Sequence, residues 1–183
     1  MAVKRIVRYL KGTNDFGLYY KRSEKFELNA YTNADWGGNI DEKKSTSGGA
    51  LFLGRRLVTW TSKKQSCTSQ SIAEAEYVAT AISCTNIMWI KHLLKGMKEE
   101  ITKPMILYCD NTSVINISKS LVMHAKTKHI AIKYHYVRQL VEDKQVKMEY
   151  INSKKQIFDI FTKPLPKNAF DYLRGKLGVK PLS

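Results

Sequence analysis

Cysteine is scarce in this sequence, and long apolar runs are absent from it. The three cysteines, Cys67, Cys84 and Cys109, are widely spaced and form no C-x-x-C pair, so neither a disulfide framework nor a zinc ribbon is supported. No apolar stretch approaches the roughly 18 residues of a membrane span, and the opening MAVKRIVRYL lacks the apolar core of a signal peptide. We therefore expect a soluble cytosolic or nuclear protein with reduced thiols and no membrane partner.

Acidic residues are also in short supply, with 16 of them against 31 lysines and arginines. The formal net charge of +15 is far more than solubility requires, and it indicates a polyanionic partner, with nucleic acid as the first candidate. For any single lysine, a solvated helix face is the more common role, so the charge argues only as a group. The length of 183 residues suits one domain with a substantial core.

Hydrophobic periodicity predicts a mixed α/β domain. A basic amphipathic helix and an extended segment over residues 16–22 open the chain, and the elements then follow in the order β-β-β-α-β-α-α-β-α. The strands are expected over 26–36, 48–54, 57–62, 105–110 and 146–151, and the helices over 71–97, 112–119, 129–143 and both sides of 163–166. The first three strands form an antiparallel meander with a turn at Gly54, whereas the later strands run parallel to the first because helices separate them.

Acidic residues at two strand ends mark the predicted site. In such a sheet, ligands bind at the carboxyl ends of the parallel strands, where Asp35 and Asp110 lie. Asn33 points to the same face of its strand as Asp35, about 6.6 Å away along it. Hydrolysis of a phosphodiester commonly uses two Mg²⁺ ions held by several carboxylates. Clustered carboxylates repel one another, so finding them together implies cations.

Two of the candidate acids lie near helix starts and therefore have structural alternatives. Asp110 precedes a helix and could cap it, a role that Asn111 or Thr112 could also fill. Ser71 and Glu74 are predicted to form a capping box. This leaves Glu76 either as a metal ligand or as a solvated carboxylate near the helix dipole.

Asp159 is the last candidate acid, and it lies in an apolar stretch near the C-terminus. We expect Ser153 and Gln156 to cap the helix that contains it. A carboxylate among so many apolar residues either faces a polar site or lies on the outer face of the helix.

Six groups of motifs carry a resemblance that covers essentially the whole chain. In order they are YTNADWGGN with KSTSGGALFLG, LVTWTSKKQ, AEAEYVA, LYCDN, KTKHIAIKYHYVR, and DIFTKPLP with LRGKLGV. Together they resemble the ribonuclease H domain that closes the Pol polyprotein of copia-type LTR retrotransposons, those of plants especially. The opening AVKRIVRYLKGT resembles the end of the preceding reverse transcriptase region. The resemblance thus implies that residues 1–22 end the reverse transcriptase or connection region and that residues 23–183 are the RNase H domain.

The resemblance implies an RNase H fold, a five-stranded mixed sheet with helices on both faces. It implies metal-dependent endonucleolytic cleavage of the RNA strand of an RNA/DNA hybrid during reverse transcription, with two Mg²⁺ ions per site and Mn²⁺ as a substitute. The partners would be the hybrid and the reverse transcriptase domain of the same polyprotein. The place of action would be a cytoplasmic virus-like particle, with the nucleus as a further location.

In this fold the metal ligands run Asp, Glu, Asp, Asp along the chain. The resemblance places Glu76, Asp110 and Asp159 at the last three positions, and it places Asn33 at the first, where the family has Asp. Asp35 matches the second acid of the family's D-A-D-W or D-S-D-W stretch. An amide oxygen brings no charge and bridges two ions poorly, so we expect cleavage to be weakened or abolished. Three explanations stay open: Asp35 substitutes, the element is a decayed copy, or the residue was mutated to trap substrate.

Other roles remain open beside the nuclease. A hybrid-binding domain without activity shares every motif except a working metal pair, and an inert connection domain keeps only the fold. An integrase-like transferase is disfavoured, because its ligands run Asp, Asp, Glu. Contacts to nucleic acid are expected from Lys63, Lys64, Asn111, Lys126, Lys128, His129, Lys133, Arg138 and Lys163.

Overall fold

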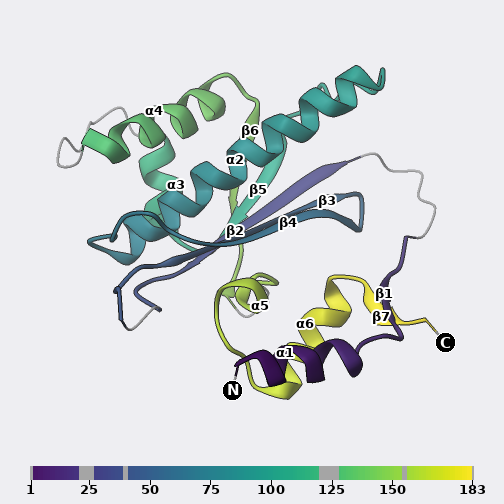
Figure 1. Ribbon diagram of the computed structural model, residues 1–183. Coiled ribbons are helices and arrows are strands. Elements are labelled where there is room, and N and C mark those ends of the chain that lie inside the picture. Colours follow the sequence, from purple (N-terminus) through teal and green to yellow (C-terminus); the bar gives the residue numbers. More distant parts are fainter. Residues whose placement is uncertain (1, 21–26, 39–40, 120–127, 154–155, 183) are drawn as a thin grey trace.

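A mixed sheet of five strands forms the centre of the molecule, in the order β4-β3-β2-β5-β6 (Figure 1). The structure, a computed structural model, describes residues 2–20, 27–38, 41–119, 128–153 and 156–182, with only the backbone described for 128–131. The strands are β2 (Leu28–Asp35), β3 (Thr46–Leu53), β4 (Arg56–Lys64), β5 (Met105–Cys109) and β6 (Val146–Tyr150). β2, β3 and β4 pair antiparallel, while β5 pairs parallel with β2 and with β6. The predicted mixed sheet is confirmed.

Three helices cover one face of this sheet (Figure 1). They are α2 (Ile72–Gly96), α3 (Thr112–Lys119) and α4 (Lys128–Glu142), close to the predicted ranges. α2 packs on β2 and β3 and also contacts α4. The main core lies between these layers, and its most deeply buried side chains include Tyr77, Ile87, Leu107, Val114 and Val137. Burial of this apolar surface is the main force that holds the helices on the sheet.

The opposite face of the sheet carries two further helices, α5 (Asp159–Thr162) and α6 (Lys167–Lys176), with Pro164 and Pro166 in the segment between them. α5 packs on β2, β3 and β4. A smaller core of Ala50, Phe52, Leu57, Phe158 and Leu177 lies on this side. Helices on both faces of the sheet were predicted, and the structure confirms them.

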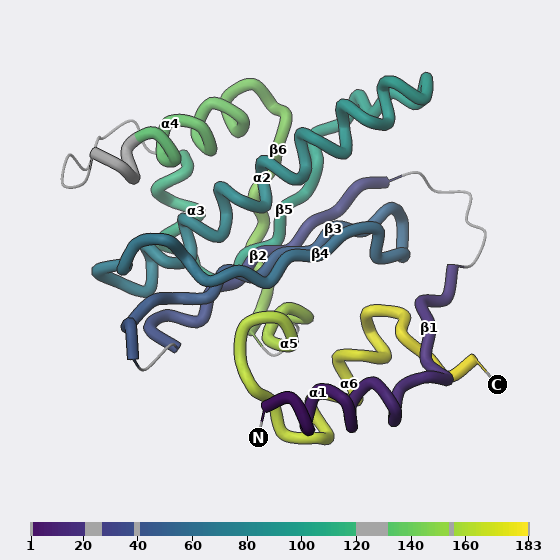
Figure 2. Tube along the Cα trace, in the orientation of Figure 1, coloured from purple at the N-terminus to yellow at the C-terminus, as the bar shows by residue number. Residues whose placement is uncertain are grey.

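The N-terminal and C-terminal segments lie on the same side of the sheet as α5 and α6 (Figure 2). β1 (Phe16–Leu18) pairs antiparallel with β7 (Val179–Pro181), with Gly17 opposite Lys180. The sequence predicted an extended segment at β1 but not β7, whose pairing depends on residues at the other end of the chain. The helix α1 (Ala2–Lys11) has no buried residue, and its apolar side chains Val3, Ile6, Val7 and Leu10 are exposed.

Local interactions explain where the helix α2 begins and where the β3–β4 hairpin turns. Ser71 Oγ accepts the N–H of Glu74 at 3.2 Å, and a Glu74 carboxylate oxygen accepts the N–H of Gln70 at 2.8 Å. The predicted capping role of Glu74 is thus confirmed, although its acceptor role is directed one residue earlier than in a standard capping box. Gly54, at φ +62°, forms the predicted turn between β3 and β4, a conformation that glycine adopts without strain.

The predicted cap of the Asp159 helix is wrong. α5 begins only at Asp159, and the residue before it makes no side-chain cap. Gln156 is instead buried, and its Nε2 donates to the carbonyl oxygen of Thr32 at 3.0 Å. The polar spacing suggested a cap, whereas tertiary contact with β2 determines what Gln156 does. None of the helices in the described residues is both long and apolar enough to cross a membrane.

Candidate metal centre and nucleic-acid interface

The candidate site lies at the edge of the sheet where β2 and β5 end, close to the start of α2 and to α5 (Figure 1). β2 and β5 are parallel neighbours, so their carboxyl ends meet at this edge. Four of the five expected metal ligands converge there in two pairs: Glu76 with Asp110, and Asn33 with Asp159. The fifth, Asp35, turns toward the loop after β2.

Glu76 lies near the start of α2 and points at the end of β2. Its Oε1 accepts the N–H of Ala34 at 3.0 Å, which fixes the carboxylate against the strand. The side chain is only 4% exposed, and within the described residues Oε2 has no hydrogen-bond partner. Since Ser71 and Glu74 cap the helix, Glu76 has no capping role. Its burial excludes the alternative of a solvated first-turn carboxylate.

Asp110 follows β5 directly and faces Glu76. The helix α3 is capped by Asn111, whose Oδ1 accepts the N–H of Ser113 at 3.0 Å. The cap alternative for Asp110 is therefore excluded. One ligand atom from each of Glu76, Cys109 and Asp110 lies within 4.8 Å of the other two, a separation that one cation can span.

The electrostatics of this pair favour a bound positive charge. Burial raises the pKa of Glu76 to about 8, and the Asp110 and Asp159 carboxylates add to the rise. The Ala34 N–H and the Lys163 ammonium act in the opposite direction. In the isolated protein Glu76 thus holds a proton near neutral pH, and a divalent cation would replace that proton. The unpartnered Glu76 oxygen and the oxygen-rich donor pair fit a hard cation such as Mg²⁺ or Mn²⁺.

Cys109 lies within this cluster, and the sequence reasoning missed it. Burial raises the pKa of its thiol to about 12, and its sulfur accepts the N–H of Asn111 at 3.4 Å. A neutral thiol is a poor ligand for a hard cation, so we assign Cys109 a packing role. A signal was present in the sequence, because alternation along β5 places Met105, Leu107 and Cys109 on one buried face.

Asn33 and Asp159 form the second pair, and they bond to each other directly. Asn33 Nδ2 donates to Asp159 Oδ1 at 2.8 Å and lies 3.4 Å from Thr162 Oγ1. The same Asp159 oxygen accepts the Lys163 ammonium at 2.8 Å. Asn33 is only 4% exposed, so this amide is enclosed. The outer-face alternative for Asp159 is therefore excluded, and its carboxylate is already neutralised by groups of the chain itself.

Close packing of α5 on the sheet brings Asp159 to this position. Gly48 lies opposite Asn33 in the β2–β3 ladder, and a Cβ there would come within 2.5 Å of the Thr162 methyl group. Ser62 Oγ donates to the carbonyl oxygen of Phe161 at 2.6 Å, which ties the helix to β4. The glycine of the KSTSGG motif thus has a defined role, because it lets the helix approach the strand.

Asp35 ends β2 opposite Thr46. Its carboxylate lies against the backbone of Gly38, and it is not part of the Glu76–Asp110 cluster of the described residues. The neighbouring Trp36 donates its indole N–H to the carbonyl oxygen of Ser69 at 3.1 Å, so the loop is held at the site's rim. A ligand role for Asp35 would require its side chain to rotate, and it stays a prediction.

The basic residues expected to contact nucleic acid lie on several elements. Lys63 is exposed at the end of β4, whereas Lys64 beside it bonds Glu42 at 2.6 Å. Lys133 lies on α4, and Arg138 on the same helix lies 3.7 Å from a Glu142 oxygen. Lys126 lies outside the described residues, as do the side chains of Lys128 and His129. The phosphate contacts of the whole set, with Asn111 and Lys163, stay predictions.

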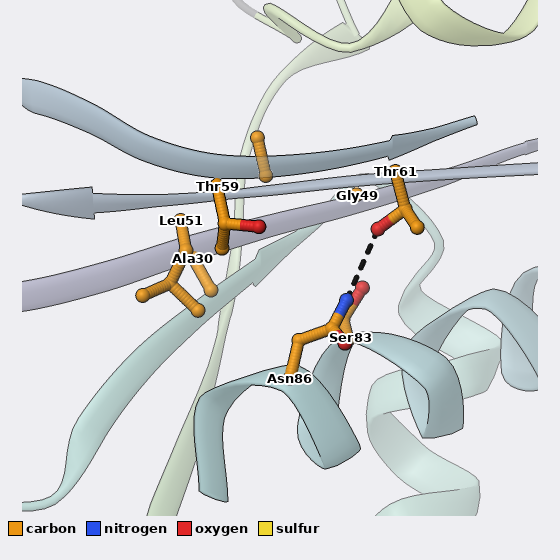
Figure 3. Close-up of a pocket in the computed structure, with 8 residues that line it drawn as sticks. Ala30, Gly49, Leu51, Thr59, Thr61, Ser83 and Asn86 are labelled. Atoms are coloured by element: carbon orange, nitrogen blue, oxygen red, sulfur yellow. Dashed lines mark hydrogen bonds between the residues drawn. The ribbon is translucent and has the colours of Figure 1, made fainter. Parts of the chain in front are cut away.

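A second site with buried polar side chains lies between the sheet and α2 (Figure 3). It is a small pocket of about 10 Å³ lined by Ala30, Gly49, Ala50, Leu51, Thr59, Thr61, Ser83 and Asn86. Asn86 Nδ2 donates to Thr61 Oγ1 at 3.0 Å, while the buried Ser83 Oγ has no partner within the described residues. A Cβ at Gly49 would come within 2.6 Å of that Ser83 oxygen.

Known sequences that resemble this chain include Pol polyproteins of retrotransposons. No protein-family model matches the chain. A Pol polyprotein of transposon RE1 from Arabidopsis thaliana is 38% identical over 97% of the chain, and that of TNT 1-94 from Nicotiana tabacum is 36% identical over 97%. Both of these relatives are Pol polyproteins of plant retrotransposons. The chain spans only 12–13% of the length of these relatives.

Comparison with solved structures identifies the fold. The N-terminal RNase H domain of a Mycobacterium tuberculosis protein matches with a TM-score of 0.52 and 11% identity, over 81% of this chain and 98% of that one. LC11-RNase H1, solved in complex with an RNA/DNA hybrid, matches with a TM-score of 0.55 and 11% identity, over 80% and 98%. The chain therefore has the RNase H fold, as expected from its motifs.

Proposed function

We propose that this chain is an RNase H-type nuclease domain that acts on the RNA strand of RNA/DNA hybrids during reverse transcription. The observation that carries the proposal is the buried Glu76 carboxylate, which lies beside Asp110 at the carboxyl ends of β2 and β5 and has one oxygen without a hydrogen-bond partner in the described residues. An unpaired charge at such a depth is strongly unfavourable unless a cation is bound. Evidence from the homologues agrees, since retrotransposon Pol polyproteins provide the setting for hybrid cleavage.

Glu76 and Asp110 would hold a divalent cation, with Mg²⁺ or Mn²⁺ the ions that suit oxygen donors. When bound, such an ion activates water and stabilises the charge that develops on the phosphodiester. The residues of the chain supply the geometry. Ala34 fixes one Glu76 oxygen, and Asn111 caps α3 so that Asp110 is free to face the site.

Several coarser features support a nucleic-acid substrate. The net charge of +15 favours a polyanion, and the structurally similar LC11-RNase H1 was solved with an RNA/DNA hybrid. We infer that a reverse transcriptase domain of the same polyprotein is the covalent partner, with residues 1–22 as the end of that region and 23–183 as the nuclease domain. We place the activity in a cytoplasmic virus-like particle and in the nucleus.

A second candidate function is hybrid binding without cleavage. The contacts among Asn33, Asp159 and Lys163 favour it, because they occupy the half of the site where a second cation would be expected. Positive charge around the site would still attract the hybrid, largely independently of its sequence. The two functions differ only in whether the bound hybrid is cut.

Cleavage of a labelled RNA/DNA hybrid separates the two. The chain, Asn33→Asp and Asp35→Asn should be compared with Mg²⁺ and with Mn²⁺, and hybrid affinity should be measured in parallel. We expect weak or no cleavage by the chain and faster cleavage by Asn33→Asp, and a loss of any cleavage with Asp35→Asn would identify Asp35 as a ligand. Hybrid binding by the chain without cleavage by any variant would leave the binding function. Absence of both binding and cleavage would refute the proposal.

A further inference from the structure

We propose that this site holds one divalent cation, at Glu76 and Asp110, and that the chain's own Asn33 amide and Lys163 ammonium replace a second cation at Asp159. This inference rests on the proposed RNase H-type site and says how many ions that site takes. It assigns Asn33 and Lys163 a role that neither their positions in the sequence nor the resemblance specifies.

The first argument concerns the donors around Asp159. A carboxylate can only accept hydrogen bonds, and an ammonium can only donate them. Asp159 Oδ1 accepts from Asn33 Nδ2 and from Lys163 Nζ, each at 2.8 Å. A metal ion at this oxygen would have to displace both donors. The carboxylate is therefore stabilised without a metal, by one charged and one neutral donor.

The second argument concerns which end of the Asn33 amide faces the site. The Asp159 carboxylate requires a donor, so the amide nitrogen faces it and the carbonyl oxygen faces elsewhere. Thr162 Oγ1, at 3.4 Å from the same nitrogen, supports that orientation because it can also accept. A cation bridging positions 33 and 159 needs an oxygen at both. The observed amide orientation offers N–H groups instead.

The third argument concerns Lys163, which is built into the turn that carries Asp159. Its backbone N–H donates to the carbonyl oxygen of Asp159 at 3.1 Å, where α5 ends. The side chain then returns along one helical turn to its own i−4 carboxylate. The ion pair is thus local and does not require another domain or nucleic acid.

The remaining half of the site has the opposite character. Within the described residues, neither Glu76 nor Asp110 forms a salt bridge, and Glu76 Oε2 is buried without a partner. When all three acids are ionised, Glu76, Asp110 and Asp159 carry three negative charges, of which Lys163 neutralises one. A single divalent cation would balance the two negative charges that remain. Asn33→Asp adds one more negative charge and replaces the donor with an oxygen ligand, which creates the demand for a second ion.

Counting bound Mn²⁺ in the absence of nucleic acid tests this inference. Calorimetry and electron paramagnetic resonance of free Mn²⁺ should be applied to the whole chain and to the Asn33→Asp, Asp110→Asn and Asp159→Asn variants, with circular dichroism confirming that each is folded. We expect one ion for the chain and for Asp159→Asn, none for Asp110→Asn, and two for Asn33→Asp.

Lys163→Met provides a second measurement, with Lys167→Met as the matched control on the exposed start of α6. Loss of the ammonium should strengthen binding of a second Mn²⁺ roughly tenfold, as expected for one unit charge a few ångströms away, whereas Lys167→Met should not change it. Equal effects of the two variants would contradict the role of Lys163 as an internal cation.

The outcomes separate this inference from the proposed function. Two ions bound to the chain as it stands, or retention of the ion by Asp110→Asn with loss in Asp159→Asn, would overturn the inference and leave the nuclease proposal intact. One ion bound at Glu76 and Asp110 together with no binding or cleavage of hybrid by any variant would support the inference and overturn the function. Absence of any bound ion would overturn the single-cation inference, and the hybrid assay would then decide the function on its own.

Discussion

Several buried side-chain oxygens lack a hydrogen-bond partner within the described residues, and two of them lie in places that differ in charge. Glu76 Oε2 lies in the acidic cluster at the sheet edge, and Ser83 Oγ lies in the small pocket between the sheet and α2 (Figure 3). An unpaired carboxylate in a low-dielectric environment is far more unfavourable than an unpaired hydroxyl. We therefore expect a cation at Glu76, whereas the fold can tolerate the unpartnered Ser83 hydroxyl.

The largest expected effect comes from removing the charge at the first place. Glu76→Gln should abolish tight Mn²⁺ binding and reduce any hybrid cleavage by at least about 100-fold, because a metal ion contributes several kcal/mol to such a reaction. The measurement is cleavage of labelled hybrid by the Asn33→Asp protein with and without Glu76→Gln. Glu74→Gln is the matched control on the same helix, since Glu74 bonds the Gln70 N–H and is not in the metal cluster. Equal losses in both variants would place the effect in the helix rather than in the metal site.

The second expected effect is a dependence of stability on pH in the metal-free protein. The pKa of Glu76 is raised from 4.5 to about 8 in the folded state, so the unfolded chain releases this proton at lower pH than the folded one. Glu76 therefore does not lower the free energy of unfolding below pH 4.5, and it lowers this free energy progressively as the pH rises toward 8. The free energy of unfolding should fall by up to about 1.4 kcal/mol per pH unit in that window.

Urea unfolding in EDTA across this pH range is the appropriate measurement. Glu76→Gln should flatten the profile, because glutamine does not titrate. Excess Mn²⁺ should also reverse the decline, since the ion stabilises the ionised form. An identical pH profile for the chain and for Glu76→Gln in EDTA would show that other groups cause the decline.

A smaller effect is expected where the site already neutralises itself. Asn33→Asp replaces the donor to Asp159 with a second carboxylate, so it should destabilise the metal-free protein by about 2 kcal/mol. Added Mn²⁺ should restore that loss, and Asn33→Ala, which removes the donor without adding charge, should not be rescued. Unfolding with EDTA and with Mn²⁺ distinguishes the three proteins. Equal stability of Asn33→Asp and the chain in EDTA would mean that the hydrogen bond contributes little.

The sequence predicted the charged half of the site better than the neutralised half. Glu76 and Asp110 follow from local signals, because a capping pair at Ser71 and Glu74 leaves Glu76 free and a strand end exposes Asp110. The bond between Asn33 and Asp159 joins residues 126 positions apart, and its direction depends on which end of an amide faces a carboxylate. No periodic pattern encodes that choice.

The fold shows the same division between local and distant determinants. The antiparallel meander of β2, β3 and β4 and the helices α2 and α3 could be predicted because amphipathic periods and turn residues are local. The pairing of β1 with β7 and the contact of Gln156 with β2 could not, since each depends on residues more than 100 positions apart. Burial in the folded chain, rather than intrinsic preference, determines these contacts.

The smallest expected effect is at the uncharged pocket. Ser83→Ala removes a buried hydroxyl that has no hydrogen-bond partner in the described part of the chain, so it should stabilise the protein by about 0.5 to 1 kcal/mol. Ser118→Ala is the matched control, because Ser118 is also buried but its Oγ donates to the Ile115 carbonyl oxygen at 2.8 Å. Loss of that hydrogen bond should destabilise the protein by about 1 kcal/mol. Urea unfolding of both variants measures the difference. A destabilising Ser83→Ala would instead mean that the pocket holds one ordered water that bridges Ser83 and its polar neighbours. The pocket volume of about 10 Å³ is close to the minimum for one water, which would then be the hydrogen-bond partner of the Ser83 hydroxyl.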